Sequence, residues 1–365
     1  MGLENRKGSR VFFTYKETKT GQENHPENYK VNGARFEGRG TMTLPAPTRV
    51  VESDKGKLGS GEAGKKARLM TIATPWSYKT NRPGEIGFLL CFFMGKADTY
   101  ASTYFHTLYH LKQGSLELPT FGFQFGDGVT NKVFAGAVVN EFNITMPFQG
   151  GNGQIEATFS GWANSHYVAS DVITVLPTGT FSSGFDNTFA EPIVNVKSTS
   201  VWLADSLEPA FGASSIGAAA EDLGANLIDI TTLINSLTIT GNNGMSMEDK
   251  LRAGGCGIIN DWTRGVRAVT CELNARKDTS IINWDTIATA RTQKALEVEW
   301  NGPTLGASTY LLDMFIPVIE VNTCPEDDGT PVSQAITTEV FQDANEEALI
   351  IRVNSSSSKA YDTVS

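Results

Sequence analysis

Residues 59–66 (GSGEAGKK) are the stretch whose residue types and spacing come nearest to a ligand-binding motif. The pattern G-x-x-x-x-G-K runs from Gly59 to Lys65, and such a loop cradles phosphate when it joins a buried strand to a helix. Lys66 stands where a serine or threonine would bind magnesium. The preceding VVESDKGKL does not have the pattern of a buried strand. We therefore interpret residues 59–66 as a flexible basic loop and expect no nucleotide to bind.

Two histidines and four cysteines are the other candidates for metal or redox chemistry. His106 and His110 stand four apart in YFHTLYHL, and on a helix they would share one face. Zinc needs three or four ligands, and no third ligand is near in the sequence, so we expect no metal site. The cysteines lack C-x-x-C spacing, and MGLENRKGSR at the N-terminus does not have the pattern of an export signal. We expect reduced, mostly buried thiols, in a protein made in a cytoplasm, at Cys91, Cys256, Cys271 and Cys324.

No other spacing in the chain is typical of catalysis. The patterns G-x-S-x-G and H-E-x-x-H do not occur, and no paired carboxylates stand in a recognisable catalytic setting. We predict a protein that is not an enzyme, with no catalytic, cofactor-binding or metal-binding residues and no cofactor. Carboxylates that are distant in sequence could still converge in the fold, so an enzyme stays an open alternative.

The composition indicates a folded, turn-rich β protein. The 365 residues are 40% hydrophobic and 19% charged, with 36 glycines against 14 prolines. No run of 18 apolar residues occurs, so we expect no membrane insertion by this chain. The net charge is −10, and acidic residues gather in PEDDG (325–329) and DANEEA (343–348). A protein that grips DNA needs a basic stripe to neutralise phosphates, so this balance excludes that class.

Residues 138–164 (VVNEFNITMPFQGGNGQIEATFSGWAN) predict an antiparallel hairpin with one face on a core. The alternation places Glu141 and Asn143 on one side of the first strand and Phe142 on the other. The glycine-rich QGGNG (149–153) supplies the turn. The same reasoning predicts further strands over 10–20, 33–44, 115–125, 195–204, 233–240, 264–274, 294–302, 308–322, 333–341 and 346–354.

Two segments predict helices. Residues 81–95 begin with Pro83 and Glu85 in a first turn and then run apolar, which predicts a buried helix. Residues 278–293 predict an amphipathic helix with Asp278 or Thr279 as its N-cap. Its apolar stripe would be Ile282, Trp284, Ile287 and Ala288.

Both halves of the chain follow the order strand, long loop, strand, helix, strands. This order predicts two similar domains, 1–180 with a long loop at 45–68, and 186–365, with a boundary in the stretch PTGTFSSGFDN (177–187). Two pairs of segments are similar between the halves. VVNEFNIT matches LINSLTIT, and GRGTMTL matches RGVRAVTCEL. These two matches do not give one register, so the alignment of the repeat stays open.

A strand ending in a polar loop, then R-G-x-R-x-V-T-x-x-L, then a helix opened by an aspartate, then closing strands, resembles the tail tube proteins of long-tailed (siphovirus-like) bacteriophages. Residues 233–354 carry the resemblance, and residues 10–164 are similar through GRGTMTL, the apolar helix and the hairpin. It implies a mainly β fold, in which antiparallel β-sandwich or partly closed barrel domains are each flanked by a helix. The chain looks like a duplicated-domain form of that family.

The resemblance also implies a function. Such subunits form stacked rings whose lumen conducts DNA, without specific binding, into the host. The chain would be part of the virion tail. Its partners would be other copies of itself and the tape measure, tail terminator and distal tail or baseplate proteins. Two units per chain predict rings of three copies with pseudo-sixfold symmetry. The loops 45–68 and 241–263 are then candidates for contacts to the next ring.

We further expect part of the acidic surplus to face the lumen, where it would repel passing DNA over roughly a Debye length of about 8 Å. The alternative is that the acidic residues only keep the outer surface soluble, at Glu326, Asp327, Asp328, Glu346 and Glu347. Two other functions stay open. The chain could be another virion structural protein, such as a baseplate or hub protein, or a β-sandwich carbohydrate-binding protein.

Overall fold

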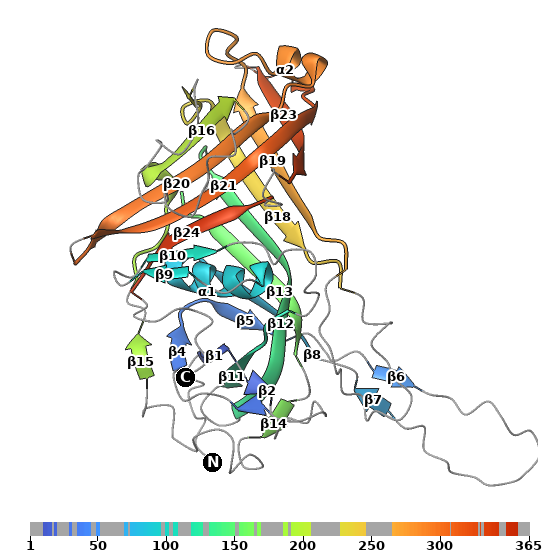
Figure 1. Cartoon of the computed structure of the whole chain (residues 1–365), viewed down its shortest axis with the longest axis vertical. Coiled ribbons are helices and arrows are strands. Elements are labelled where there is room, and N and C mark those ends of the chain that lie inside the picture. Colours follow the sequence, from blue (N-terminus) through green and yellow to red (C-terminus); the bar gives the residue numbers. More distant parts are fainter. Residues whose placement is uncertain are drawn as a thin grey trace, which may run out of the picture.

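The computed structural model of the chain describes most of its strands and two helices (Figure 1). The described residues are 10–16, 18–19, 29–30, 35–44, 49–51, 69–71, 74–95, 99–101, 105–108, 118–126, 131–149, 153–163, 166–168, 185–188, 191–205, 227–245, 265–306, 308–327, 329, 332–342 and 348–356.

The elements of the first half lie before residue 190. They are β1 (Arg10–Lys16), β2 (Thr18–Lys19), β3 (Tyr29–Lys30), β4 (Arg35–Gly38), β5 (Thr41–Thr43), β6 (Arg49–Val51), β7 (Leu69–Thr71), β8 (Thr74–Thr80), α1 (Pro83–Met94), β9 (Thr99–Ala101), β10 (Phe105–Leu108), β11 (Phe121–Gly126), β12 (Asn131–Pro147), β13 (Glu156–Ala163), β14 (His166–Val168) and β15 (Phe185–Thr188).

The second half begins with the short 3-10 helix η2. Its elements are η2 (Val196–Ser198), β16 (Thr199–Asp205), β17 (Ile228–Asp229), β18 (Ile234–Asn242), β19 (Ala268–Arg276), α2 (Trp284–Ala290), β20 (Lys294–Leu305), β21 (Ser308–Thr323), β22 (Glu326–Asp327), β23 (Ser333–Phe341) and β24 (Ile350–Asn354).

One antiparallel sheet passes from the first half into the second through the long strand β12. The first residues of β12 pair with β11 and β14, and its later residues pair with β13 and β18. From β18 the sheet continues through β19 and β23 to β21, which also pairs with β20 and β24. The sheet does not close into a barrel, and among the described strands only β15 pairs in parallel, with β4. The predicted mainly β, sandwich-like antiparallel fold is confirmed.

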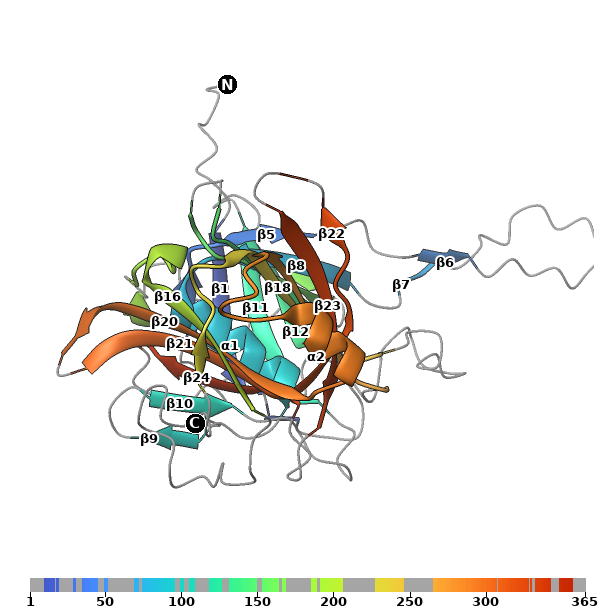
Figure 2. The same ribbon diagram turned by 90° about the horizontal axis from the view of Figure 1, so that it is seen from above.

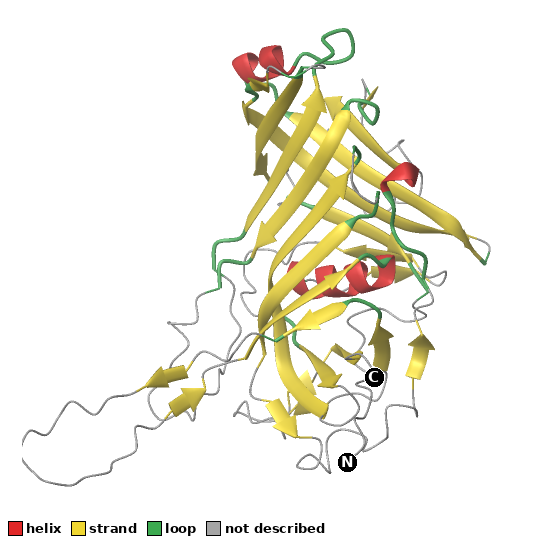
Figure 3. Cartoon of the chain, turned by 180° about the vertical axis from the view of Figure 1, so that it is seen from behind, coloured by secondary structure: helices red, strands yellow, loops and turns green. Residues whose placement is uncertain are grey.

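A large hydrophobic core runs through both halves. Phe142 and Ile144 of β12 belong to the same cluster as Ile239 of β18 and Trp300 of β20. The helix α1 lies inside this core, and all twelve of its residues are buried (Figure 3). It packs against β10, β12, β21 and β24. A helix that is apolar on every side must be buried in this way, so the predicted buried helix at 81–95 is confirmed.

Local signals fix where α1 begins and ends. Pro83 stands in its first turn, where no intrahelical N–H is lost. Gly95 ends the helix in the left-handed conformation, with φ of 83°, and its N–H donates to the carbonyl of Cys91.

Arg267, within the RGVR motif, joins the second half to the C-terminal end of α1. Its Nη2 donates to the carbonyls of Phe93 and Met94, both at 3.2 Å, and the guanidinium lies 5.5 Å from the Phe93 ring centroid. Its Nε donates to Asn243 Oδ1 at 2.7 Å, and Asn243 donates in turn to the carbonyl of Phe93. A cation at the carbonyl end of a helix satisfies groups that have no intrahelical partner.

Glu191 closes the opposite end of α1. Its carboxylate accepts from the backbone N–H of Gly84 at 2.6 Å and of Ser356 at 2.9 Å, so it ties the segment between the halves to the helix and to the C-terminal segment. Burial raises the pKa of Glu191 to about 7, although these N–H donors act to lower it. The neighbouring Glu85 carboxylate adds to the rise.

Two expectations about α2 and the long loops were wrong in part. The helix spans only Trp284–Ala290, and its N-cap is Asn283, which accepts from the N–H of Thr286. Asp278 instead accepts from the N–H and hydroxyl of Ser280, a local turn that stops helix formation before residue 283. The predicted loop 45–68 contains the strand β6, and β18 extends into the predicted loop 241–263. Residues 243–245 follow β18 in the described part, and the other residues of both loops lie outside it.

The strands β6 and β7 form a two-stranded ribbon that stands apart from the other described elements (Figures 1 and 2). Thr43 pairs with Ser77 in β5 and β8, and Arg49 pairs with Thr71 in β6 and β7. The same number of residues separates the two pairs on each side. The pairing of β6 with β7 therefore has the same register as the pairing of β5 with β8.

The division into two domains stays a prediction. The two halves are closely joined, because β12 pairs with β18 and because residues of both halves belong to the same core.

Replacing Glu191 by glutamine is expected to flatten the dependence of stability on pH. A folded-state pKa above the usual value means that the protonated form stabilises the fold below pH 4.5 and that this contribution is lost as the pH rises through 7. Between pH 5 and 8 the wild-type free energy of unfolding should fall by up to about 3 kcal/mol more than that of Glu191→Gln. Urea unfolding at both pH values measures this, and equal falls would contradict it.

Candidate functional surface

The continuous sheet β5–β8–β13–β12–β18–β19–β23 presents one face to the core and the other to solvent. The strands of this sheet alternate along their length, because successive side chains of a strand point to opposite faces. The outward positions in the middle of these strands, called here the polar face, are Ser77, Lys79, Glu141, Asn143, Thr145, Glu156, Thr158, Ser160, Thr238, Thr240, Asn242, Ala268, Thr270, Glu272, Ala335, Thr337 and Glu339.

Residues between these positions fill the core. Phe142, Phe159, Ile239 and Cys271 are each at most 3% exposed. Because the period is two, a shift of one residue in any pairing would bring apolar side chains to the polar face. The core therefore fixes which side chains form the polar face.

The registers place polar side chains in rows that cross the sheet. One row runs through Lys79, Thr158, Asn143, Thr240, Thr270 and Glu339, each the direct pairing partner of the next. Six strands at about 4.8 Å spacing make this row roughly 24 Å long. The polar face is thus an extended surface and not a compact pocket.

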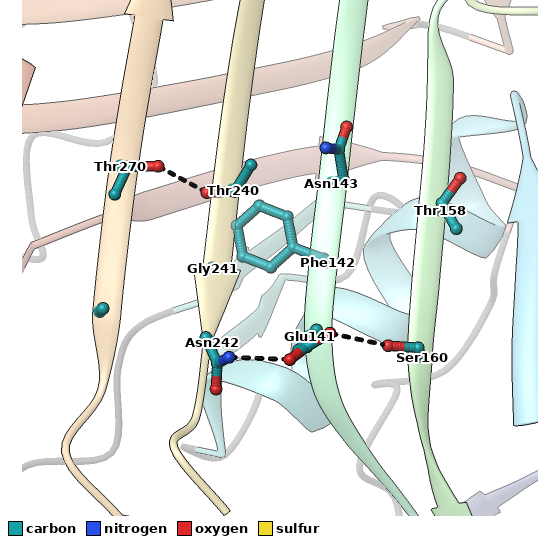
Figure 4. A pocket seen from close by; sticks show the side chains of 10 residues that line it. Glu141, Phe142, Asn143, Thr158, Ser160, Thr240, Gly241, Asn242 and Thr270 are labelled. Atoms are coloured by element: carbon teal, nitrogen blue, oxygen red, sulfur yellow. Dashed lines mark hydrogen bonds between the residues drawn. The ribbon is translucent and has the colours of Figure 1, made fainter. Parts of the chain in front are cut away.

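Hydrogen bonds between strands order the middle of the polar face. Asn242 Nδ2 donates to Glu141 Oε1 at 2.8 Å, and the Ser160 hydroxyl donates to Glu141 Oε2 at 3.4 Å (Figure 4). The hydroxyls of Thr240 and Thr270 lie 2.5 Å apart. These bonds link four neighbouring strands through side chains alone.

A shallow depression of about 380 Å³ lies over the same residues (Figure 4). Gly241 lies beneath it. A Cβ on this residue would stand 2.2 Å from the Phe142 ring and 2.7 Å from the Phe93 ring. Those two rings meet edge to face with centroids 4.7 Å apart. Only glycine leaves room for this contact.

The polar face carries more negative than positive side chains. Its carboxylates are Glu141, Glu156, Glu272 and Glu339, against the single ammonium of Lys79, and Arg276 lies further along β19 on the same side. Lys79 lies 2.8 Å from Glu156, and both side chains are about half exposed, so this pair contributes little to stability. The face offers hydroxyl, amide and carboxylate groups, which suits a wetted surface that does not hold phosphate.

The candidates that the sequence raised for other chemistry lie elsewhere. His106 is in strand β10, where its backbone pairs with Val353, so the idea that His106 and His110 share a helical face is wrong. His110 and residues 59–66 lie outside the described part. Cys91 and Cys271 are buried thiols and Cys324 is a half-buried one, as predicted; Cys256 is outside the described residues.

The described residues were searched for metal-binding groups and for membrane-spanning helices. No group of three His, Cys, Asp or Glu side chains among them could hold a metal ion. No helix among them is long and apolar enough to cross a membrane.

The structure describes two of the five acidic residues that were named from the sequence. Glu326 and Asp327 form β22 and are exposed beside α2, where Glu326 contacts Lys277. Asp328, Glu346 and Glu347 lie outside the described residues. The alternation in β12 had placed Glu141 and Asn143 on the outward side. Glu272 and Glu339 were not singled out, although the same period of two in their strands was visible.

Comparison with known protein families gives a match. A family model described as phage tail tube protein matches residues 71–340, which is 270 of the 365 residues and includes most strands of the polar face. Comparison with curated proteins gives no match.

Gly241→Val is expected to destabilise the protein, whereas the adjacent Thr240→Val should not. The valine methyl groups would collide with the rings of Phe142 and Phe93, and overpacking of this kind costs about 1–3 kcal/mol. Thr240 points outward, and its replacement removes one side-chain hydrogen bond, worth about 1 kcal/mol or less. Thermal unfolding of both variants measures the difference. Equal losses would contradict the assignment of the two faces.

Proposed function

The chain belongs to the phage tail tube protein family, and we propose that its polar face forms the inner wall of a closed tube through which DNA leaves the virion. As a member of that family it is a structural component of the virion tail, and the family is not one of enzymes. The observation that carries the proposal is the unbroken polar face across both halves of the chain.

The edges of this sheet support assembly with further copies. Among the described strands, β5 pairs with β8 alone, and Glu320, Val321 and Thr323 of β21 pair with β23 alone. The helix α2 also packs against β21. An exposed strand edge is a row of unpaired donors and acceptors that another strand can bind. Head-to-tail pairing of identical chains at such edges closes a ring when the rotation fits.

The number of strands favours three copies in a ring. With β21 included, each chain contributes eight strands to the wall. Strands spaced about 4.8 Å apart and tilted by about 40° give one copy a barrel roughly 16 Å across, which side chains would fill. Three copies give roughly 48 Å from backbone to backbone, which leaves an open channel.

The strand order in the two halves supports two similar domains, 1–180 and 186–365. Along the sheet the first half runs β5, β8, β13, β12, and the second half runs β18, β19, β23, β21. In each half the first two strands keep their chain order and the last two are exchanged. In each half a helix follows the second strand. Four wall strands per half also fit a pseudo-sixfold ring of three chains.

The other partners follow from family membership alone. We propose that the tube built by this chain meets the tape measure, tail terminator and distal tail or baseplate proteins. A baseplate or hub role is the second candidate, because such a protein would also form a ring but would not extend it. A filament of many stacked rings would favour the tube.

Averaged cross-sections of assembled tubes should show three chains and a wall of 24 strands around the lumen. The expected image follows from eight wall strands in each chain. Electron cryomicroscopy of the purified, concentrated protein measures it, and native mass spectrometry of single rings gives the copy number. Six whole chains in a ring would show that the second half lies outside the wall.

Reversing charge on the polar face should turn the lumen into a surface that holds DNA. Tubes of the triple variant Glu141→Lys, Glu272→Lys and Glu339→Lys, assembled with a short labelled duplex, should retain roughly tenfold more DNA at low salt than wild-type tubes and release it as salt rises. The triple glutamine variant at the same positions is the matched control. Equal retention by lysine and wild-type tubes would place these residues away from the DNA path.

A further inference from the structure

We propose that β24 and the two residues after it form a strap that ties the first half of the chain to the second, and that this strap loosens ahead of the pairing of β12 with β18 when the buried carboxyl groups that hold it lose their protons. The strap is defined here as residues 350–356. It is a property of the single chain and does not rest on the proposed function.

The strand β24 lies between the two halves. On one side it pairs with β21, where Ile351 lies opposite Met314, and on the other side it pairs with β10, where Ile351 lies opposite Leu108. Among the described strands, β10 otherwise pairs with β9 alone. Opening of the strap would therefore leave β9 and β10 without another strand partner in the described part of the chain, while the pairing of β12 with β18 stays intact.

One side of β24 is held by apolar contacts. Ile351 and Val353 belong to the large core, and α1 packs against β24. These contacts contain no group that titrates near neutral pH. A response of the strap to pH must therefore come from the polar groups on its other side and at its end.

The other side of β24 carries Arg352, which is buried against two carboxyl groups of the second half. Its Nε donates to Asp313 Oδ2 at 2.5 Å, and its Nη2 donates to Glu297 Oε1 at 3.2 Å. Glu299 lies directly opposite Asp313 in the pairing of β20 with β21 and is also buried. Three buried carboxyl groups thus stand near one guanidinium, and neighbouring charges of one sign favour the uptake of a proton.

The end of the strap is held by a fourth buried carboxyl group. Glu191 Oε1 accepts from the N–H and the hydroxyl of Ser356, at 2.9 and 3.0 Å. Its Oε2 accepts from the N–H of Gly84 in the first turn of α1, at 2.6 Å. Glu191 therefore connects the strap directly to the helix, and the nearby charge of Glu85 favours the protonated form of Glu191.

Other titratable or charged residues stand at or next to the strap. They are Arg82 before α1, Glu85 in α1, His106 in β10 opposite Val353, and Tyr310 in β21 close to Glu191. The Glu85 carboxylate accepts from groups outside the strap, namely the hydroxyls of Tyr78 and Thr80 and the N–H of Arg39. Opening of the strap would leave these three bonds in place, so the titration of Glu85 is not coupled to it.

Burial gives Glu191 and Asp313 the same sense of pH dependence. It raises the pKa of Glu191 to about 7, and it also raises the pKa of Asp313, although Arg352 acts to lower the latter. A carboxyl group with a raised pKa stabilises the closed strap while it is protonated, and this contribution is lost as the pH rises through the raised pKa. Deprotonation of both groups therefore weakens the strap between pH 5 and pH 8.

Hydrogen–deuterium exchange of the unassembled chain tests the strap. After correction for the intrinsic exchange rate at each pH, the opening constant of the strap amides should rise roughly a hundredfold from pH 5 to pH 8, because Glu191 regains its ordinary pKa when the strap opens. At pH 8 these amides should be protected at least about tenfold less than those of β12 and β18. Equal protection in the two regions would show that the strap opens only with the whole fold and would overturn the proposal.

Neutral variants separate the effect of charge from that of packing. Glu191→Gln should remove most of the rise with pH, and Glu191→Gln combined with Asp313→Asn should remove nearly all of it. The matched control is Glu141→Gln, which changes a carboxylate of the polar face and should keep the wild-type rise. A rise that survives in the double variant contradicts the assignment to these two groups.

Trypsin gives a second measure at a single pH. An open strap exposes the peptide bond after Arg352, and intact mass identifies the product that has lost residues 353–365. At pH 8 the wild-type chain should be cut at this bond faster than the double variant, with circular dichroism of both chains as the folding control. Equal rates would contradict the proposal, and if the double variant does not fold, the exchange of the wild-type chain across pH decides.

Discussion

The backbone pairing of β12 with β18 is the interaction on which the rest of the structure depends. It runs from Glu141 opposite Asn242 to Pro147 opposite Ser236, and it joins the two halves within the sheet, as the shorter pairing of β10 with β24 also does. Side chains alternate between the two faces of the sheet in both strands. The register of this pairing therefore places the apolar residues of both halves on the side of one core. The same pairing aligns the polar residues of both halves on one outward face. Core and polar face are two consequences of a single register.

The helix α1 secures that register from the core side. Its C-terminal carbonyls accept from Arg267, which precedes β19, and Asn243, which follows β18, donates to the carbonyls of Phe93 and Val139. A slip of β18 along β12 would separate these buried donors from their acceptors, and unsatisfied buried groups are costly. Packing and hydrogen bonding therefore select the same alignment. Gly241 adds a steric condition, since any side chain there would push Phe142 away from Phe93.

The sequence predicted which segments form strands more reliably than which strands pair with each other. Alternation gave the strands β12, β13, β20, β21 and β23 and the buried helix α1, because each is a local pattern of apolar spacing. It missed β8, although Trp76 and Tyr78 alternate with Ser77 and Lys79 in TPWSYKT. It also misjudged α2, where Asn283 and not Asp278 is the cap, because a local turn at Asp278 competes with the helix. The polar face needs long-range register, which no local pattern contains.

The similarity between VVNEFNIT and LINSLTIT has a different meaning in the structure from the one that the sequence suggests. These segments lie in β12 and β18, which are direct neighbours, with Ile144 opposite Ile239. Two strands that share a core face and an outward face need similar alternation whether or not they descend from one ancestor. By their place along the sheet, β18 instead corresponds to β5, and β12 corresponds to β21.

The helices differ between the halves far more than these strands do. All residues of α1 are buried, whereas in α2 only Trp284 is. In the proposed ring every wall strand pairs on both sides, so positions on the polar face meet similar neighbours in each half. The helices meet unlike surroundings. Under the proposed two-domain organisation, the chain can therefore keep one wall and vary what lies behind it. A ring of identical single-domain chains cannot vary its helices in this way, because any change to a helix is repeated at every position of the ring.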